Sequence, residues 1–256
     1  MGRGTTWDRQ LQWLVRHGAV YTYDAPGHRG RDVKRPASVT TESFVAELAA
    51  AVETTVETTV DTTVDTTVET TVETTVETIG APAVLIGHSM GAMHSWCLAA
   101  SRPDLVAGLV IEDMAPDFVG RTVGEWEPWL HALPAEFDSA EAVLAEFGAV
   151  AGRYFLEAFD RTVTGWRLHG EPDDWVRIAA EWGGEDYWTQ WSAVRVPVLL
   201  IEAGDSVTPP GQMMTMAQMA GDRATYVRIE GAGHLAHDDA PEQYRAAVEM
   251  FLRELS

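Results

Sequence analysis

The chain has 256 residues, 46% hydrophobic and 22% charged, which supplies enough apolar material for the core of one sizeable domain. Its net charge of −21 leaves no basic surface for nucleic acid or for anionic membranes, so a small molecule is the expected partner. The single cysteine, Cys97, excludes an internal disulfide, and without a signal peptide or a membrane-length apolar run a cytoplasmic location is expected.

Short apolar runs that alternate with helical patterns predict the secondary structure. The predicted strands are Ala19–Tyr23, Ala83–Ile86, Gly108–Ile111, Pro197–Ile201 and Ala224–Ile229. The predicted helices are Trp7–Val15, Phe44–Val52, Met90–Ala100, Gln212–Met219 and Pro241–Leu255. This alternation indicates an α/β fold with a mostly parallel, doubly wound sheet that is covered on both faces.

A low-complexity repeat, residues 53–78, separates the second predicted helix from the second predicted strand. Valine recurs at every fourth position from Val52 to Val76. On a helix such a stripe drifts by about 40° per repeat, so no single face stays apolar. We interpret the repeat as an insertion without a functional role, either an extended, fraying helix or disorder.

The alternation of strands and helices stops at residues 116–194, where only helical patterns occur. Asp138 and Glu141 have the spacing of a capping box and predict a helix start. Seven of the ten tryptophans lie in this segment. We expect a helical cap here, on a core formed by residues 1–115 and 195–256. Its tryptophans either attach the cap to the core or line an apolar pocket.

The strongest motif follows the second predicted strand and reads Gly87-His88-Ser89-Met90-Gly91. Between a strand and a helix, such a motif forms a tight turn that exposes the serine oxygen at the edge of the sheet. Glycine at both flanking positions avoids collisions in that turn. Ser89 is therefore the predicted nucleophile, and the backbone N–H of Met90 is predicted to stabilise an oxyanion.

A nucleophilic serine needs a base and an acid that orients the base. Asp205 follows the fourth predicted strand and His234 follows the fifth, at the sheet edge where the sites of such folds lie. Asp113, after the third strand, and Glu202, at the end of the fourth, remain alternatives for the acid.

The other histidines receive less specific interpretations. His237 lies close to the predicted base and is interpreted as a surface residue beside Asp238 and Asp239. None of the eight histidines forms a metal-type cluster with cysteine or carboxylate residues, and no phosphate loop or dinucleotide motif is visible. No metal and no cofactor is therefore expected.

Taken together, four stretches resemble the α/β-hydrolase family in its capped, esterase-like branch: YDAPGHRGRD, GHSMG, GDSVTP and GAGHLAHDDAPE. The resemblance covers the chain from Trp7 to its end, apart from the repeat. It implies a triad of Ser89, Asp205 and His234, in that family's chain order. It also implies that three N-terminal strands, and a His-Gly pair before Met1, are missing from this chain.

The predicted function is that of a serine hydrolase acting on a small apolar or aromatic carboxylic ester. Hydrolysis of a carbon–carbon bond beside a ketone, by the same triad, is the alternative. A second alternative is a catalytically silent protein that binds a ligand in the capped pocket. That alternative stays open because the second oxyanion donor of the family would fall on Met1.

Overall fold

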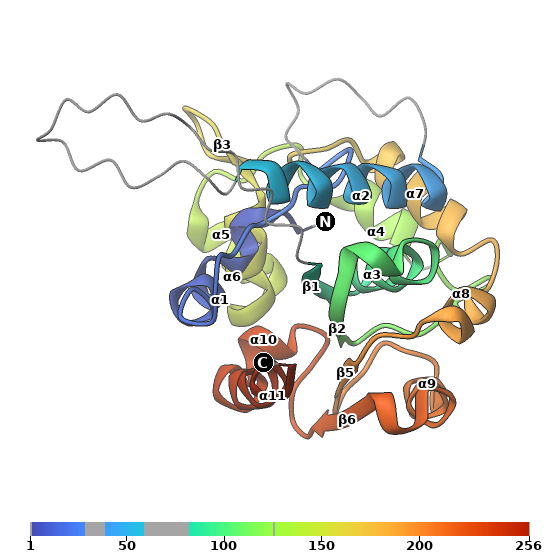
Figure 1. Ribbon diagram of the computed structural model, residues 1–256. Helices are drawn as coiled ribbons and strands as arrows, with labels where there is room; N and C mark the ends of the chain where they lie inside the picture. The colour runs from blue at the N-terminus through green and yellow to red at the C-terminus, as the bar shows by residue number, and fades with distance from the viewer. Residues whose placement is uncertain (1, 29–38, 59–81, 125, 256) are drawn as a thin grey trace, which may run out of the picture.

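A parallel four-stranded sheet forms the centre of the computed structural model, which describes residues 2–28, 39–58, 82–124 and 126–255 (Figure 1). The strands are β1 (Ala83–His88), β2 (Val106–Glu112), β5 (Val198–Ala203) and β6 (Ala224–Ile229), and this is also their order across the sheet. Four of the five predicted strands therefore form, each within a few residues of its predicted bounds.

Helices cover both faces of the sheet, as the doubly wound fold requires. They are α3 (Met90–Ser101) and α9 (Gln212–Ala220) on one face, and α1 (Asp8–Leu14) and α11 (Pro241–Leu255) on the other. Successive residues of β2 enter different cores: Leu109 and Ile111 join the cluster under α3, whereas Val110 joins the cluster under α11. The predicted fold class is confirmed.

The predicted strand Ala19–Tyr23 was wrong, because these residues have an irregular conformation. Within the described residues, β1 pairs with β2 and with no other strand. A lone segment gains no ladder hydrogen bonds, and the Tyr21 side chain remains 54% exposed. The short helical turns outside the segment 116–194 are η1 (Gly4–Trp7), η2 (Pro103–Leu105), η3 (Gly221–Arg223) and α10 (Ala236–Asp239).

Residues 116–194, called the cap segment below, are mostly helical. The helices are α4 (Trp126–Ala132), α5 (Ala140–Phe147), α6 (Ala149–Ala158), α7 (Pro172–Trp182) and α8 (Trp188–Ala193). A short antiparallel hairpin, β3 (Asp160–Arg161) and β4 (Trp166–Arg167), interrupts them, so the expectation of helices alone was incomplete. Strands of two residues are too short to produce a period-two pattern in the sequence.

The start of α5 lies one residue later than its capping box predicts. Ser139 is the N-cap, and its side chain accepts a hydrogen bond from the N–H of Ala142 at 3.2 Å. Asp138 is exposed beside it. Serine and aspartate both serve as N-caps, so spacing alone does not distinguish two adjacent candidates.

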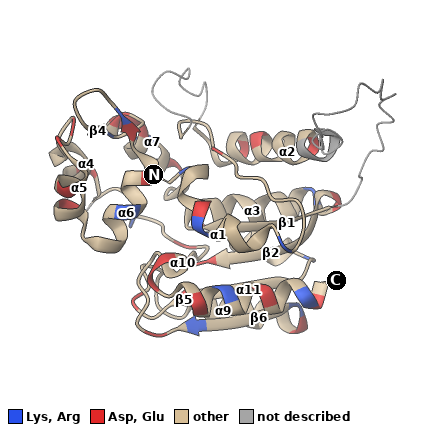
Figure 2. Ribbon diagram, turned by 90° about the vertical axis from the view of Figure 1, so that its left-hand side faces the viewer, with Lys and Arg blue, Asp and Glu red and all other residues tan. Residues whose placement is uncertain are grey.

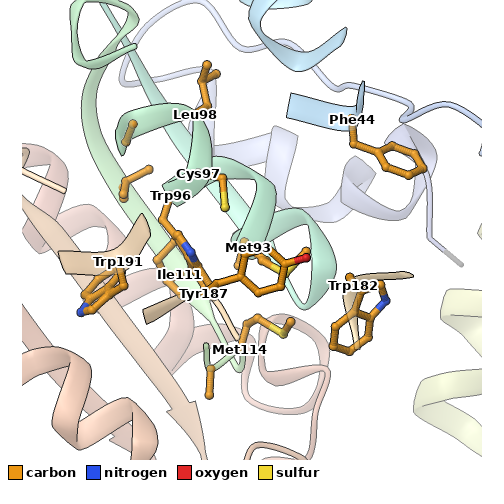
Figure 3. Close-up of a cluster of buried hydrophobic side chains, with 14 of the residues drawn as sticks. Phe44, Met93, Trp96, Cys97, Leu98, Ile111, Met114, Trp182, Tyr187 and Trp191 are labelled. Atoms are coloured by element: carbon orange, nitrogen blue, oxygen red, sulfur yellow. The ribbon is translucent and has the colours of Figure 1, made fainter. Parts of the chain in front are cut away.

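Aromatic side chains attach the cap segment to the core. Trp191 of α8 packs edge-on against Trp96 of α3, with ring centroids 5.8 Å apart, and Trp182 is buried in the same cluster (Figure 3). Trp126 and Trp129 are 46% and 37% exposed. The tryptophans of the C-terminal half of the segment therefore serve mainly as packing residues.

The repeat begins inside α2 (Thr41–Thr58), which packs on α3 through Phe44 and Val52. Residues 53–58, the first six of the repeat, are thus helical. The remainder of the repeat, residues 59–78, lies outside the described residues. Acidic residues are spread over α2, α5 and α10, whereas α7 and α11 carry both signs of charge (Figure 2). None of the described helices combines the length and the apolar character that crossing a membrane requires.

Candidate active site

Ser89 occupies the sharp turn between β1 and α3 that the sequence predicts. Its backbone has φ 53° and ψ −130°, a conformation that costs an L-residue about 1–3 kcal/mol. The Ser89 N–H donates to the carbonyl of Glu112 at 3.0 Å, which ties the turn to the end of β2. A Cβ at Gly87 would lie 2.6 Å from the backbone N of Ala92, so only glycine fits two residues before the serine.

Met90 is the first residue of α3, directly after Ser89. The first N–H groups of a helix have no acceptor within the helix, and the helix dipole favours negative charge at this end. The position is therefore suited to an oxyanion beside the serine. The second donor that the resemblance assigns to Met1 lies outside the described residues.

His234 is paired with Asp113. Its Nδ1 lies 2.7 Å from Oδ2 of Asp113, the residue that directly follows β2. Among the described non-glycine residues, only Ser89 and Asp113 have a positive φ, 44° for Asp113. Strained backbone tends to gather at functional sites, and here it marks the ends of two adjacent strands.

The Asp113 carboxylate is fully buried and held by three further donors. Its Oδ1 accepts from the Ala203 N–H at 3.1 Å and from the Ser206 hydroxyl at 2.6 Å, and Oδ2 accepts from the Val207 N–H at 3.3 Å. Burial by itself raises the pKa of Asp113, but hydrogen bonds from His234 and Ser206 outweigh it, so the pKa lies below its usual value. The group stays anionic beside the imidazole.

The expected pairing of Asp205 with His234 is not found, and this is the main correction to the predicted site. Asp205 is exposed, and its N–H donates to the carbonyl of Ala232 at 2.9 Å. Before it, Gly204 lies so close to the histidine loop that a Cβ there would be 2.7 Å from the N of Gly231. This close packing leaves the Asp205 side chain on the solvent side.

Glu202, the other alternative for the acid, is occupied elsewhere. It accepts a short hydrogen bond from the Tyr226 hydroxyl, and Nη1 of Arg228 lies 3.6 Å from its Oε1. Both partners belong to β6, so Glu202 serves the pairing of β5 with β6. Asp113 is therefore the carboxylate that the fold brings to His234.

His88 lies between the serine and the histidine loop. Its Nε2 donates to the carbonyl of His234 at 2.8 Å, and the two rings are 4.4 Å apart. Burial, together with His234 and His237, lowers the pKa of His88 well below its usual range. A neutral ring of defined tautomer thus supports the backbone of His234.

His237 is buried, which corrects its interpretation as a surface residue. Its side chain is 1% exposed, and its Nδ1 lies 2.8 Å from Oε1 of Glu112. The same oxygen accepts from the His237 N–H at 2.9 Å. The residue lies on α10, whose buried residues are Ala236 and His237. The adjacent acidic residues in the sequence do not reveal that His237 points inward.

Sequence reasoning missed two residues of this region, Glu112 and Ser206. A signal for the first exists, because Glu112 and Asp113 are consecutive carboxylates at the end of an apolar strand, where charge is rarely buried without a purpose. Ser206 has no such signal. Across the described residues, no group of three or more histidine, cysteine, aspartate or glutamate side chains is arranged to hold a metal.

Comparison with known proteins identifies relatives of this chain. The chain is 27% identical to the mouse sn-1-specific diacylglycerol lipase ABHD11 over 194 residues, 67% of this chain and 59% of the lipase. It is 20% identical to an (E)-2-((N-methylformamido)methylene)succinate hydrolase of Acinetobacter baylyi, over 96% of this chain and 84% of that protein. In the first three curated relatives, the match spans less than two thirds of the relative's length.

Solved structures share the fold. An E-2-(acetamidomethylene)succinate hydrolase superposes with a TM-score of 0.73 at 20% identity, covering 98% of this chain and 88% of that one. A thermophilic esterase from Thermogutta terrifontis gives a TM-score of 0.69 at 20% identity, covering 99% of this chain and 86% of that one. The sequence model of the alpha/beta hydrolase family matches residues 2–247. This chain therefore belongs to the alpha/beta hydrolase family.

Proposed function

We propose that the protein is a serine hydrolase in which Ser89 is the nucleophile, His234 the general base and Asp113 the acid that orients it. The observation that carries the proposal is the 2.7 Å contact between His234 Nδ1 and the buried Asp113 carboxylate. It differs from the sequence prediction in one member only, with Asp113 in place of Asp205.

The chemistry follows from the tautomer that this contact selects. Because Nδ1–H donates to Asp113, the lone pair of His234 is on Nε2, where it can take the proton of the Ser89 hydroxyl. The serine oxygen then attacks an acyl carbonyl, and the Met90 N–H stabilises the developing oxyanion. A water molecule, activated by the same imidazole, later releases the acyl group.

The substrate class is a small apolar or aromatic carboxylic ester. Tyr154 of α6 lies 6.4 Å from His88, between ring centroids, and packs against Phe155 at 5.6 Å. Through them an aromatic cluster of the cap segment extends to His88, the residue directly before Ser89. Such surroundings favour a neutral acyl group over a charged one.

The test is labelling with a fluorophosphonate probe, combined with turnover of p-nitrophenyl acetate and benzoate. We expect labelling of the wild type and its complete loss in Ser89→Ala. Ser101→Ala, at the other end of the helix that follows Ser89, is the matched control and should label like the wild type. Equal labelling of Ser89→Ala would overturn the proposal. Labelling without ester turnover would favour the carbon–carbon alternative, and a folded protein that does not label would favour the binding protein.

A further inference from the structure

Two consecutive buried carboxylates at the end of β2 each hold one histidine of the same loop. Asp113 holds His234, and Glu112 holds His237, three residues further along the chain. Both carboxylates are fully buried. The proposed triad accounts for the first pair and leaves the second without a role.

The contact between Glu112 and His237 is about as short as that of the triad pair. The ring Nδ1 of His237 lies 2.8 and 2.9 Å from the two Glu112 oxygens. Trp7 stacks on the ring of His237, with the two ring centroids 5.0 Å apart and the ring planes inclined by 20°. The amide of Gln10 donates to the carbonyl of His237 at 3.0 Å. The start of α10 is thus anchored to both β2 and α1.

The pair is also connected to the nucleophile. The carbonyl of Glu112 accepts the Ser89 N–H at 3.0 Å, and Glu112 is the register partner of His88 across the sheet. His88 in turn donates to the carbonyl of His234. One residue at the end of β2 therefore contacts the serine turn through its backbone and the histidine loop through its side chain.

The charged groups around His234 and His237 determine the electrostatic effect of the Glu112–His237 pair. Burial lowers the pKa of His237, but the carboxylates of Glu112 and Asp238 outweigh it, so the pKa lies above its usual value. The His234 ring faces Asp113 and His88. The groups that face His237 are Glu112 of β2, His88 of β1, Arg9 of α1, Tyr154 of α6, Asp238 of α10 and Tyr244 of α11.

We infer that Glu112 and His237 are positioning residues for the proposed triad. Their contact holds the histidine loop against the end of β2, and His237 neutralises the buried carboxylate of Glu112. This inference rests on the proposed function. Its consequence is that Asp113 is the carboxylate left to stabilise an imidazolium at His234. Without His237, the charge of Glu112 would act on His234 as well.

The direct test is an NMR titration of the histidine rings, which needs no turnover. In His237→Gln, the uncompensated Glu112 favours the protonated His234 ring, so its titration midpoint should rise by about one pH unit. In the double variant Glu112→Gln/His237→Gln, the buried charge is gone and the midpoint should return to that of the wild type. His131→Gln is the matched control, because His131 also contacts a carboxylate, Asp173 at 2.9 Å, but on the exposed surface.

The pH dependence of fluorophosphonate labelling is the second readout. The pH of half-maximal labelling should shift upward in His237→Gln and return in the double variant, which a purely structural role would not produce. If His237→Gln does not fold, the double variant decides: a wild-type midpoint supports the inference and a shifted one overturns it. An unchanged midpoint in a folded His237→Gln also overturns it. A wild type that never labels overturns the proposed function instead, and the NMR midpoints still test the positioning pair.

Discussion

The strands β2 and β5 are each followed by an aspartate, but the two aspartates lie in different surroundings. Both are parallel strands of one sheet, and each is followed within a few residues by an aspartate, Asp113 and Asp205. Asp113 is fully buried, has a positive φ and contacts His234, whereas Asp205 is exposed. A position after a strand therefore makes a carboxylate a candidate partner of the histidine. The direction of the backbone and the available hydrogen-bond donors decide which candidate makes the contact.

The end of β5 and the loop after it supply hydrogen-bond donors to Asp113, the proposed acid. The Ala203 N–H, the Ser206 hydroxyl and the Val207 N–H all donate to Asp113. A buried carboxylate is tolerated only when such donors replace water. The Thr208 hydroxyl lies 2.8 Å from that of Ser206 and extends the network. The β5 loop is thus a set of donors built around the end of β2.

The largest expected effect comes from exchanging the charge at each strand end. Asp113→Asn should lower kcat/KM for a p-nitrophenyl ester by roughly 10⁴, because the amide favours the wrong tautomer of His234. Asp205→Asn, the matched control, should change the rate by less than about two-fold, as expected for an exposed group outside the network. The reverse ranking would return the role of the acid to Asp205.

A smaller effect is expected from the donor that links the two strand ends. Ser206→Ala removes one hydrogen bond to a charged acceptor, worth about 1.5–3 kcal/mol, so kcat/KM should fall by roughly ten- to a hundred-fold. Ser192→Ala is the control, since the Ser192 hydroxyl is exposed and donates only to the carbonyl of Thr189. A rate equal to that of the wild type in Ser206→Ala would show that the β5 loop does not support Asp113 as the proposed acid.

The smallest expected effect is on the pH dependence of stability. The pKa of Asp113 is lowered in the folded state by the hydrogen bonds from His234 and Ser206, which outweigh its burial. Its contribution to the free energy of unfolding is therefore present above about pH 4 and is lost as the pH falls through the folded-state pKa. Urea unfolding from pH 6 to pH 3 should show a shallower loss in Asp113→Asn than in the wild type. Asp205→Asn should retain the wild-type slope, and a shallower slope in that variant would contradict the comparison.

Much of the fold could be predicted from local patterns. The four strands of the sheet and the helices α3 and α11 are encoded by apolar runs and helical periodicity within each segment. The strand expected at Ala19–Tyr23 shows the limit of this reasoning. Its composition suits a strand, but a strand is stabilised by a partner, and the partner depends on other parts of the chain.

The same division applies to the candidate site. The sequence by itself determined the turn at Ser89, because Gly87, a strand and a helix lie within a few residues of one another and specify that turn locally. Only the tertiary structure decided which carboxylate contacts His234 and where His237 lies. Asp113 receives its donors from residues 203–207 and its histidine from the loop after β6, all far away in sequence. Burial of a carboxylate depends on these distant groups meeting at one point, which no local pattern records.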